Sequence, residues 1–199
     1  MLHIDPDSTA YWNAVVHGRK RWMFLRPEEL DAAAAAIAAS GNEVLLDSLA
    51  QLAEPGAARK PRKNLASWVR ELLQQITAVR WFSQLLPMLH QADITVAAEE
   101  ALVEAGELIY GPPGVFHIAL ALEDSVGCSE QLVDEGNVLR FVQDEEYRPA
   151  FAHLGCAAGR ALWPELLEPL AEFCARAASD LKRLAAGAGR SKGRRKAEL

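Results

Sequence analysis

The chain has 199 residues, half of them hydrophobic, and a formal net charge of −6 at pH 7. This composition excludes a disordered chain, and the length allows one domain with a substantial core. No apolar run approaches the ~18 residues that a membrane span needs. The N-terminus lacks a signal-peptide pattern, so neither membrane insertion nor secretion is expected.

The cysteines of the chain are odd in number and lack C-x-x-C spacing: Cys128, Cys156 and Cys174. A disulfide framework or a zinc cluster is therefore not expected. The pattern favours a reducing compartment.

The first predicted strand is the short segment His3-Ile4-Asp5, which the turn residues 6–9 bring to an end. Residues i and i+2 of a strand point to the same face, so His3 and Asp5 would project side by side. Two ligands of a 2-His-1-carboxylate iron site need this geometry. The candidate third ligand is His117, at the end of the segment GELIYGPPGVFH.

The next elements along the chain are predicted from hydrophobic periodicity and from turn and capping signals. We expect strands at 11–16 and 20–25, helices at 28–39 and 43–52, a Pro/Gly/basic linker at 54–63, and a helix from Asn64 or Ser67 to about Arg80.

Short strands are then expected at 94–96, 108–110, 116–122 and 126–132. Beyond residue 144 the pattern becomes helical, with helices at 145–158 and 164–186, and Pro169 should kink or restart the second one. The basic residues 187–199 are expected to be disordered.

Two segments together resemble the second half of a Jumonji-C (JmjC) domain: HIDPDSTAYWNAVVHGRKRW near the start and GELIYGPPGVFH at 106–117. The resemblance is closest to the branch of arginine demethylases and lysyl hydroxylases. An HxD motif alone is a weak signal. The HxD motif followed by WNA, G-x-K-R-W and the distant histidine is a strong one.

The resemblance implies a mainly β, α+β fold: a double-stranded β-helix of the cupin (jelly-roll) type with inserted helices. The expected division is a JmjC domain at 1–144 with a helical insert at about 28–90, C-terminal helices at 145–186, and a disordered basic tail at 187–199. Domains of this family have strands before the HxD motif, so we expect the N-terminal part of the domain to be missing.

The resemblance also implies Fe(II), 2-oxoglutarate and O2. The metal ligands would be His3, Asp5 and His117. Lys20 would pair with the distal carboxylate of 2-oxoglutarate, and an unpaired buried lysine would indeed be costly. Asn13, Ser129 and Thr9 are further expected binding residues. Glu130 departs from the family pattern and would place an acid near this pocket if it pointed inward.

A dioxygenase of this family couples oxidative decarboxylation of 2-oxoglutarate to hydroxylation of a C–H bond. Hydroxylation of a carbon attached to nitrogen ends in demethylation. The expected substrate is a Lys or Arg side chain of a protein such as a histone or an RNA-associated protein. The alternative is a truncated, non-catalytic cupin domain that acts as a protein-interaction module. A cupin of another class fits Lys20 and Asn13 less well.

The basic tail fits nucleic-acid contact or nuclear import as well as it fits a solubilising end. A nuclear location is therefore expected, with the cytoplasm as the alternative. The long C-terminal helix has an apolar stripe that could pack within the chain or form a homodimer.

Overall fold

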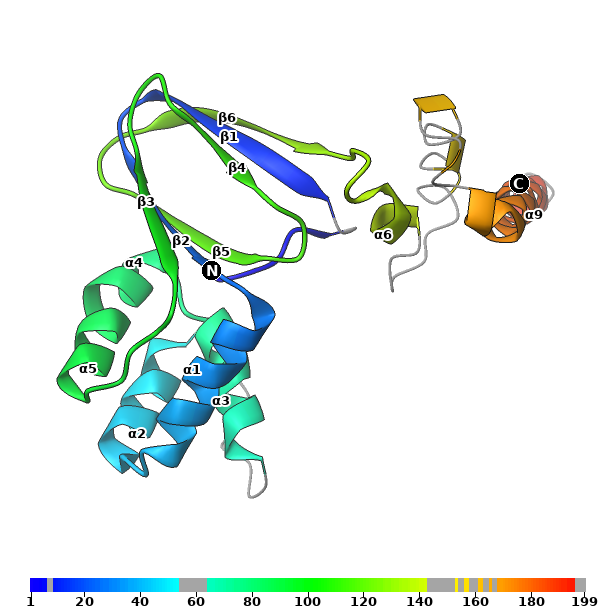
Figure 1. Cartoon of the computed structure of the whole chain (residues 1–199). Coiled ribbons are helices and arrows are strands. Elements are labelled where there is room, and N and C mark those ends of the chain that lie inside the picture. The colour runs from blue at the N-terminus through cyan, green and yellow to red at the C-terminus, as the bar shows by residue number, and fades with distance from the viewer. Residues whose placement is uncertain are drawn as a thin grey trace. The chain divides into compact units, whose positions relative to one another are not determined.

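The computed structural model describes residues 1–6, 9–53, 64–142, 153, 156–157, 161–162, 165 and 168–195 (Figure 1). They form two compact units, and each is described by itself. Unit 1 comprises Met1–Asp5 and Ala10–Gln131, and unit 2 comprises Pro6–Thr9 and Leu132–Leu199.

Unit 1 contains two three-stranded sheets whose strands come from distant parts of the chain. The first sheet has the order β4-β1-β6, and the second has the order β3-β2-β5. Their bounds are β1 Ala10–His17, β2 Lys20–Leu25, β3 Glu99–Val103, β4 Leu108–Gly111, β5 Phe116–Ala121 and β6 Val126–Leu132. Strand β1 pairs antiparallel with β4, and β2 pairs antiparallel with both β3 and β5.

The sequence of β2, KRWMFL, divides its side chains between two hydrophobic layers, because successive residues of a strand point to opposite faces. Trp22 and Phe24 pack with Tyr11 and Val15 of β1 in a core between strands of the two sheets. Met23 and Leu25 belong to a larger core that includes the helices. From Trp22 to Leu25, strand β2 therefore packs on both faces.

The helices of unit 1 pack against one face of the second sheet, where they meet β2 and β5 (Figure 1). They are α1 Pro27–Ala39, α2 Glu43–Leu52, α3 Leu65–Gln74, α4 Ala78–Arg80, the π-helical turn η2 Trp81–Leu85, and α5 Leu86–Gln91. Their buried side chains meet Met23, Leu25, Phe116 and Ile118 of the sheet. Trp81 donates its indole N–H to the Met23 sulfur at 3.2 Å, which fixes η2 against β2.

Two predicted elements of this region are wrong. The helix expected to reach Arg80 ends at Gln74, because Ile76 forms a β-bridge with Ala53 and the chain restarts as a helix after Thr77. No strand forms at 94–96. The pairing partner of β2 is instead Glu99–Val103. This strand begins with two exposed glutamates, so its sequence lacks the alternation of apolar and polar residues that predicts a strand.

Unit 2 contains α6 Val138–Val142, the 3-10 turn η3 Glu168–Leu170 and α9 Ala171–Arg195. The helix does restart after Pro169, as expected from its missing N–H. It continues to Arg195, through residues that the sequence predicted to be disordered. Extending an existing helix avoids a new nucleation step, which sequence composition does not reveal.

The cysteine prediction is wrong for two of the three residues. Cys156 and Cys174 form a disulfide, with Cα atoms 5.7 Å apart, while Cys128 is a free, exposed thiol. An odd number of cysteines therefore concealed one bonded pair and one free thiol.

The observed architecture is mixed α/β with antiparallel sheets, compatible with a jelly-roll-like fold. The predicted domain division at residues 144 and 186 stays a prediction. The linker at 54–63 and most of the helix expected at 145–158 lie outside the described residues. In the described part of the chain, no helix combines the length and apolarity that a membrane span needs.

Candidate metal centre

A backbone bridge brings the two distant histidines face to face. The His3 N–H donates to the His117 carbonyl at 3.1 Å, and the His117 N–H donates to the His3 carbonyl at 2.8 Å. Side chains of directly opposed residues in an antiparallel pair share one face. The two imidazole rings accordingly lie with centroids 4.3 Å apart.

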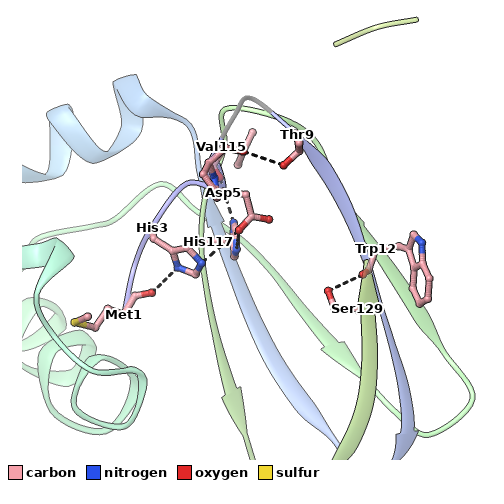
Figure 2. Close-up of polar contacts among 9 residues, drawn as sticks. Met1, His3, Asp5, Thr9, Trp12, Val115, His117 and Ser129 are labelled. Atoms are coloured by element: carbon pink, nitrogen blue, oxygen red, sulfur yellow. Dashed lines mark hydrogen bonds and ion pairs between the residues drawn. The ribbon is translucent and has the colours of Figure 1, made fainter. Parts of the chain in front are cut away.

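Asp5 completes the group because it lies two residues after His3 and projects to the same side (Figure 2). Its Oδ1 is 3.6 Å from Nε2 of His3 and 3.9 Å from Nε2 of His117. One ligand atom from each of the three side chains lies within 4.8 Å of the others. The predicted trio therefore converges.

Backbone carbonyls orient both imidazole rings. Nδ1 of His3 lies 2.9 Å from the Met1 carbonyl, and Nδ1 of His117 lies 3.3 Å from the Val115 carbonyl. A neutral imidazole that donates its Nδ1–H keeps a lone pair on Nε2, the atom that faces Asp5 in both residues. Hydrogen bonds of this kind support metal-binding histidines in proteins.

The solvent exposure of the three side chains decreases from His3 to Asp5 to His117. The His3 side chain is 56% exposed, that of Asp5 16%, and that of His117 7%. Burial lowers the pKa of His117 below its ordinary value, and the nearby His3 adds to this effect while Asp5 opposes it. The lowered pKa favours the neutral imidazole, which is the form that binds a metal.

This donor set fits a divalent cation: two imidazole nitrogens and one carboxylate oxygen on one face, with further coordination positions left open. Aromatic rings line the inner side of the group. The Tyr11, Trp22 and Phe24 rings lie 4.6, 6.1 and 6.4 Å from the His117 ring. Burial, followed by the charge of Asp5, raises the pKa of the Tyr11 phenol, which therefore stays protonated.

Lys20 starts β2, and its ammonium donates to the Asn13 side-chain oxygen of β1 at 3.3 Å. Strand β6, the neighbour of β1 in the first sheet, has Gly127 next to this ammonium. A Cβ built at Gly127 would lie 2.9 Å from the Lys20 nitrogen. The absent side chain thus leaves a recess in which the ammonium sits.

The other two predicted binding residues are engaged locally. The Ser129 hydroxyl donates to the Trp12 carbonyl at 2.9 Å, so its proton is already used. The Thr9 hydroxyl donates to the Pro6 carbonyl at 3.0 Å, and Thr9 belongs to unit 2. Their contact with a co-substrate stays a prediction.

Glu130 follows Ser129 on β6. By strand alternation, Gly127 and Ser129 share one face while Glu130 takes the other. Glu130 therefore lies on the face of β6 opposite to Gly127, the residue next to the Lys20 ammonium.

Sequence reasoning missed two glycines that shape this interior. Besides Gly127, Gly111 of β4 lies opposite Tyr11, and a Cβ there would fall 2.1 Å from the Tyr11 ring. A glycine inside a strand often marks a close approach by another group, and that signal was available for both positions.

A cavity of about 380 Å³ has two residues close to His117 in its wall, although His3, Asp5 and His117 do not line it. Phe24 and Val115, the neighbours of His117, form part of its wall, together with apolar side chains of β3 and β4. The charged residues at its edge are Arg26, Glu29, Glu99 and Glu100. Arg26 pairs with Glu29, and Arg21, outside the cavity, pairs with Glu100. The three carboxylates and one guanidinium that line the cavity make its edge acidic.

Comparison with curated proteins finds two distant relatives, both from Arabidopsis thaliana. The chain is 23% identical over 142 residues to "Arginine-specific demethylase JMJ22" and 27% identical over 159 residues to "Lysine-specific demethylase JMJ21". These matches cover 71% and 79% of this chain, but only 22% and 14% of the relatives. They support a relationship to the JmjC family. No protein-family model matches the chain.

Proposed function

We propose that this chain is an Fe(II)- and 2-oxoglutarate-dependent dioxygenase with a double-stranded β-helix fold, and that it hydroxylates or demethylates a protein side chain. The observation that carries the proposal is the convergence of His3, Asp5 and His117 from distant segments. The distant similarity to demethylases supports the same class of reaction.

His3, Asp5 and His117 would hold the iron through two imidazole nitrogens and one carboxylate oxygen. When bound, iron and 2-oxoglutarate supply the oxidising chemistry that inserts oxygen into a C–H bond. The protein contributes orientation: carbonyl groups of Met1 and Val115 fix the two imidazole rings. The aromatic rings around His117 limit the access of water from the inner side.

Lys20 would hold the distal carboxylate of 2-oxoglutarate. Its half-buried ammonium contacts a neutral amide oxygen, and no carboxylate pairs with it among the described residues. A cation in this environment favours an anionic ligand, because the ligand supplies the charge that the protein does not.

The cavity that Phe24 and Val115 help to line suits a long side chain with a cationic end. Its wall is largely apolar, and Glu99 at the edge offers negative charge. A Lys or Arg side chain combines an apolar stem with a cationic end. This complementarity supports a Lys or Arg residue of a protein as the substrate.

The test is succinate production from 2-oxoglutarate by purified protein with Fe(II), compared with His117→Ala. The matched control is His90→Ala, which removes an exposed histidine of α5. We expect turnover that His117→Ala abolishes and His90→Ala retains. Equal succinate production by wild type and His117→Ala would refute the enzyme assignment.

A second candidate, an interaction module without catalysis, is favoured by one observation. Strand β6 lies at a sheet edge, and its residues 126–131 are exposed. Exposed edges offer unpaired backbone groups to another chain. The same assay separates the two candidates, since an interaction module makes no succinate.

A further inference from the structure

Two hydrogen-bond donors inside unit 1 have no partner among the residues that the structure describes. They are the buried Tyr11 hydroxyl and the buried Trp22 indole nitrogen. Tyr11 is 3% exposed and Trp22 5%. Both residues face the core between the strands of the two sheets.

Strand register places these residues in a layer between the candidate metal centre and Lys20. Along β2, Phe24 lies opposite His117, Trp22 opposite Ala119, and Lys20 opposite Ala121. Because alternate residues share one face, Trp22 lies between the level of the metal ligand and the level of the ammonium.

Strand β1 repeats the same order. Asn13, which accepts the hydrogen bond from Lys20, is two residues from Tyr11. The Tyr11 ring lies 6.0 Å from the Trp22 ring and 4.6 Å from the His117 ring. Both unpartnered donors therefore belong to one middle layer.

The position of the Tyr11 ring is restricted. A Cβ built at Gly111 would lie 2.1 Å from both Cζ and Cε1 of the Tyr11 ring, so only glycine leaves room for the ring there. The ring is thus held against bare backbone of β4 on one side and close to the Trp22 ring on the other. A donor held in this way offers a preformed contact to a ligand.

Leaving buried donors unpaired costs free energy, and native structures rarely tolerate it without a ligand or an ordered water. Two adjacent cases in one layer suggest a shared acceptor. A ligand that extends from the metal to Lys20 must cross this layer, and a 2-oxo acid carries acceptor oxygens.

We propose that the Tyr11 hydroxyl and the Trp22 indole N–H donate hydrogen bonds to the oxygen atoms of a 2-oxo dicarboxylate that bridges the metal and Lys20. This inference rests on the proposed function, and it assigns Tyr11 and Trp22 as co-substrate-positioning residues. The unpaired donors destabilise the ligand-free chain, and the hydrogen bonds formed on ligand binding remove this destabilisation.

The central experiment is the Tyr11→Phe variant, which deletes one oxygen and preserves the ring. Binding of 2-oxoglutarate is measured by calorimetry with Mn(II) in place of Fe(II), so no turnover is needed. We expect the dissociation constant to rise roughly tenfold or more, because the lost donor contacts a charged or polarised oxygen. The melting temperature of the ligand-free variant should be equal to or above that of wild type.

Ser83→Ala is the matched control, because it also deletes one hydroxyl oxygen, and this hydroxyl is exposed on η2 and donates to the Val79 carbonyl. It should bind 2-oxoglutarate as wild type does. His117→Ala reports separately on the metal centre: loss of binding there alongside unchanged binding by Tyr11→Phe would overturn only this inference. Such a result would mean that water occupies the donors.

The indole donor has its own readout. In ¹⁵N-labelled protein with Zn(II), the Trp22 indole resonance is assigned by its absence in Trp22→Phe. Addition of 2-oxoglutarate should shift this resonance and slow its exchange with solvent. An unmoved Trp22 signal at saturating ligand would contradict the proposal for that residue.

Discussion

Lys20 and Gly127 illustrate how one missing side chain can define a binding recess. The Lys20 ammonium has the neutral Asn13 oxygen as its hydrogen-bond partner, and the space beside it exists because residue 127 lacks a Cβ. The lysine supplies charge, while the glycine on β6 decides where that charge lies.

The Gly127→Ala substitution should therefore weaken co-substrate binding while leaving the metal centre intact. The new methyl group would lie 2.9 Å from the Lys20 nitrogen and 2.9 Å from the Ala14 carbonyl, so the ammonium must move. Loss of one charge-assisted hydrogen bond costs about 1.5–3 kcal/mol, which is roughly a tenfold or greater rise in dissociation constant.

Calorimetry with 2-oxoglutarate and Mn(II) measures this change. Cys128→Ala is the control, because Cys128 is the next residue on β6 and points to the other face. Unchanged 2-oxoglutarate affinity in Gly127→Ala, with Mn(II) affinity preserved, would mean that Lys20 does not face the ligand.

The residues that the sequence could predict at this site are those whose geometry follows from local periodicity. His3 and Asp5 share a face because they are two residues apart in an extended segment. The partnership with His117 came from resemblance, since no local rule joins residues 3 and 117. The Tyr11 and Trp22 donors were not predicted, because their lack of partners depends on packing among four strands.

At the element scale, the helices of unit 1 act as the outer wall of the second sheet. Helix α3 packs mainly against α1, and its buried residues join the core that contains Met23 and Leu25 of β2. Phe116 and Ile118 of β5, which flank His117, belong to the same core. The helical insert therefore stabilises the strand that presents the buried metal ligand.

Leu72→Ala in α3 should destabilise unit 1 without any direct contact with the site. Leu72 is fully buried at 0% exposure, and truncation of such a leucine costs about 2–5 kcal/mol. Chemical denaturation followed by tryptophan fluorescence measures the loss.

Leu108→Ala provides the comparison, because Leu108 is 59% exposed on β4. We expect that variant to stay close to wild type in stability. If Leu72→Ala lost as little stability as Leu108→Ala, the helical layer would be less well packed than the structure indicates.

Local sequence signals were most informative for elements with clear ends. Helix α2 and strands β2 and β6 have the predicted bounds, because their ends carry clear capping or turn residues. The wrong predictions concern segments whose structure depends on pairing with residues far away in the sequence. Ile76 leaves the helix to bridge Ala53, and Glu99–Val103 is a strand because β2 lies beside it.

At the scale of the whole molecule, the proposed chemistry resides in unit 1. The candidate metal ligands, Lys20, Asn13 and the two unpartnered donors all belong to it. Unit 2 has a separate means of stabilisation, the disulfide between Cys156 and Cys174, packed with Val142 in a small core. Nuclear location and contact of the basic tail with nucleic acid stay predictions.

This separation predicts that the disulfide can be removed without loss of metal binding. The bridge closes a loop over a sequence separation of 18 residues, and loops of this size contribute about 3 kcal/mol in the chain-entropy account. The Cys156→Ser/Cys174→Ser double variant should therefore lose stability in unit 2, while Mn(II) binding at His3, Asp5 and His117 stays as in wild type.

Thiol titration of the denatured protein checks the bridge itself. Protein purified without reductant should show one free thiol, that of Cys128, and reduction should raise the count to three, since the chain has three cysteines. Three free thiols before reduction would remove the bridge as a source of stability. Loss of metal binding in the double variant would instead show that the units depend on each other energetically.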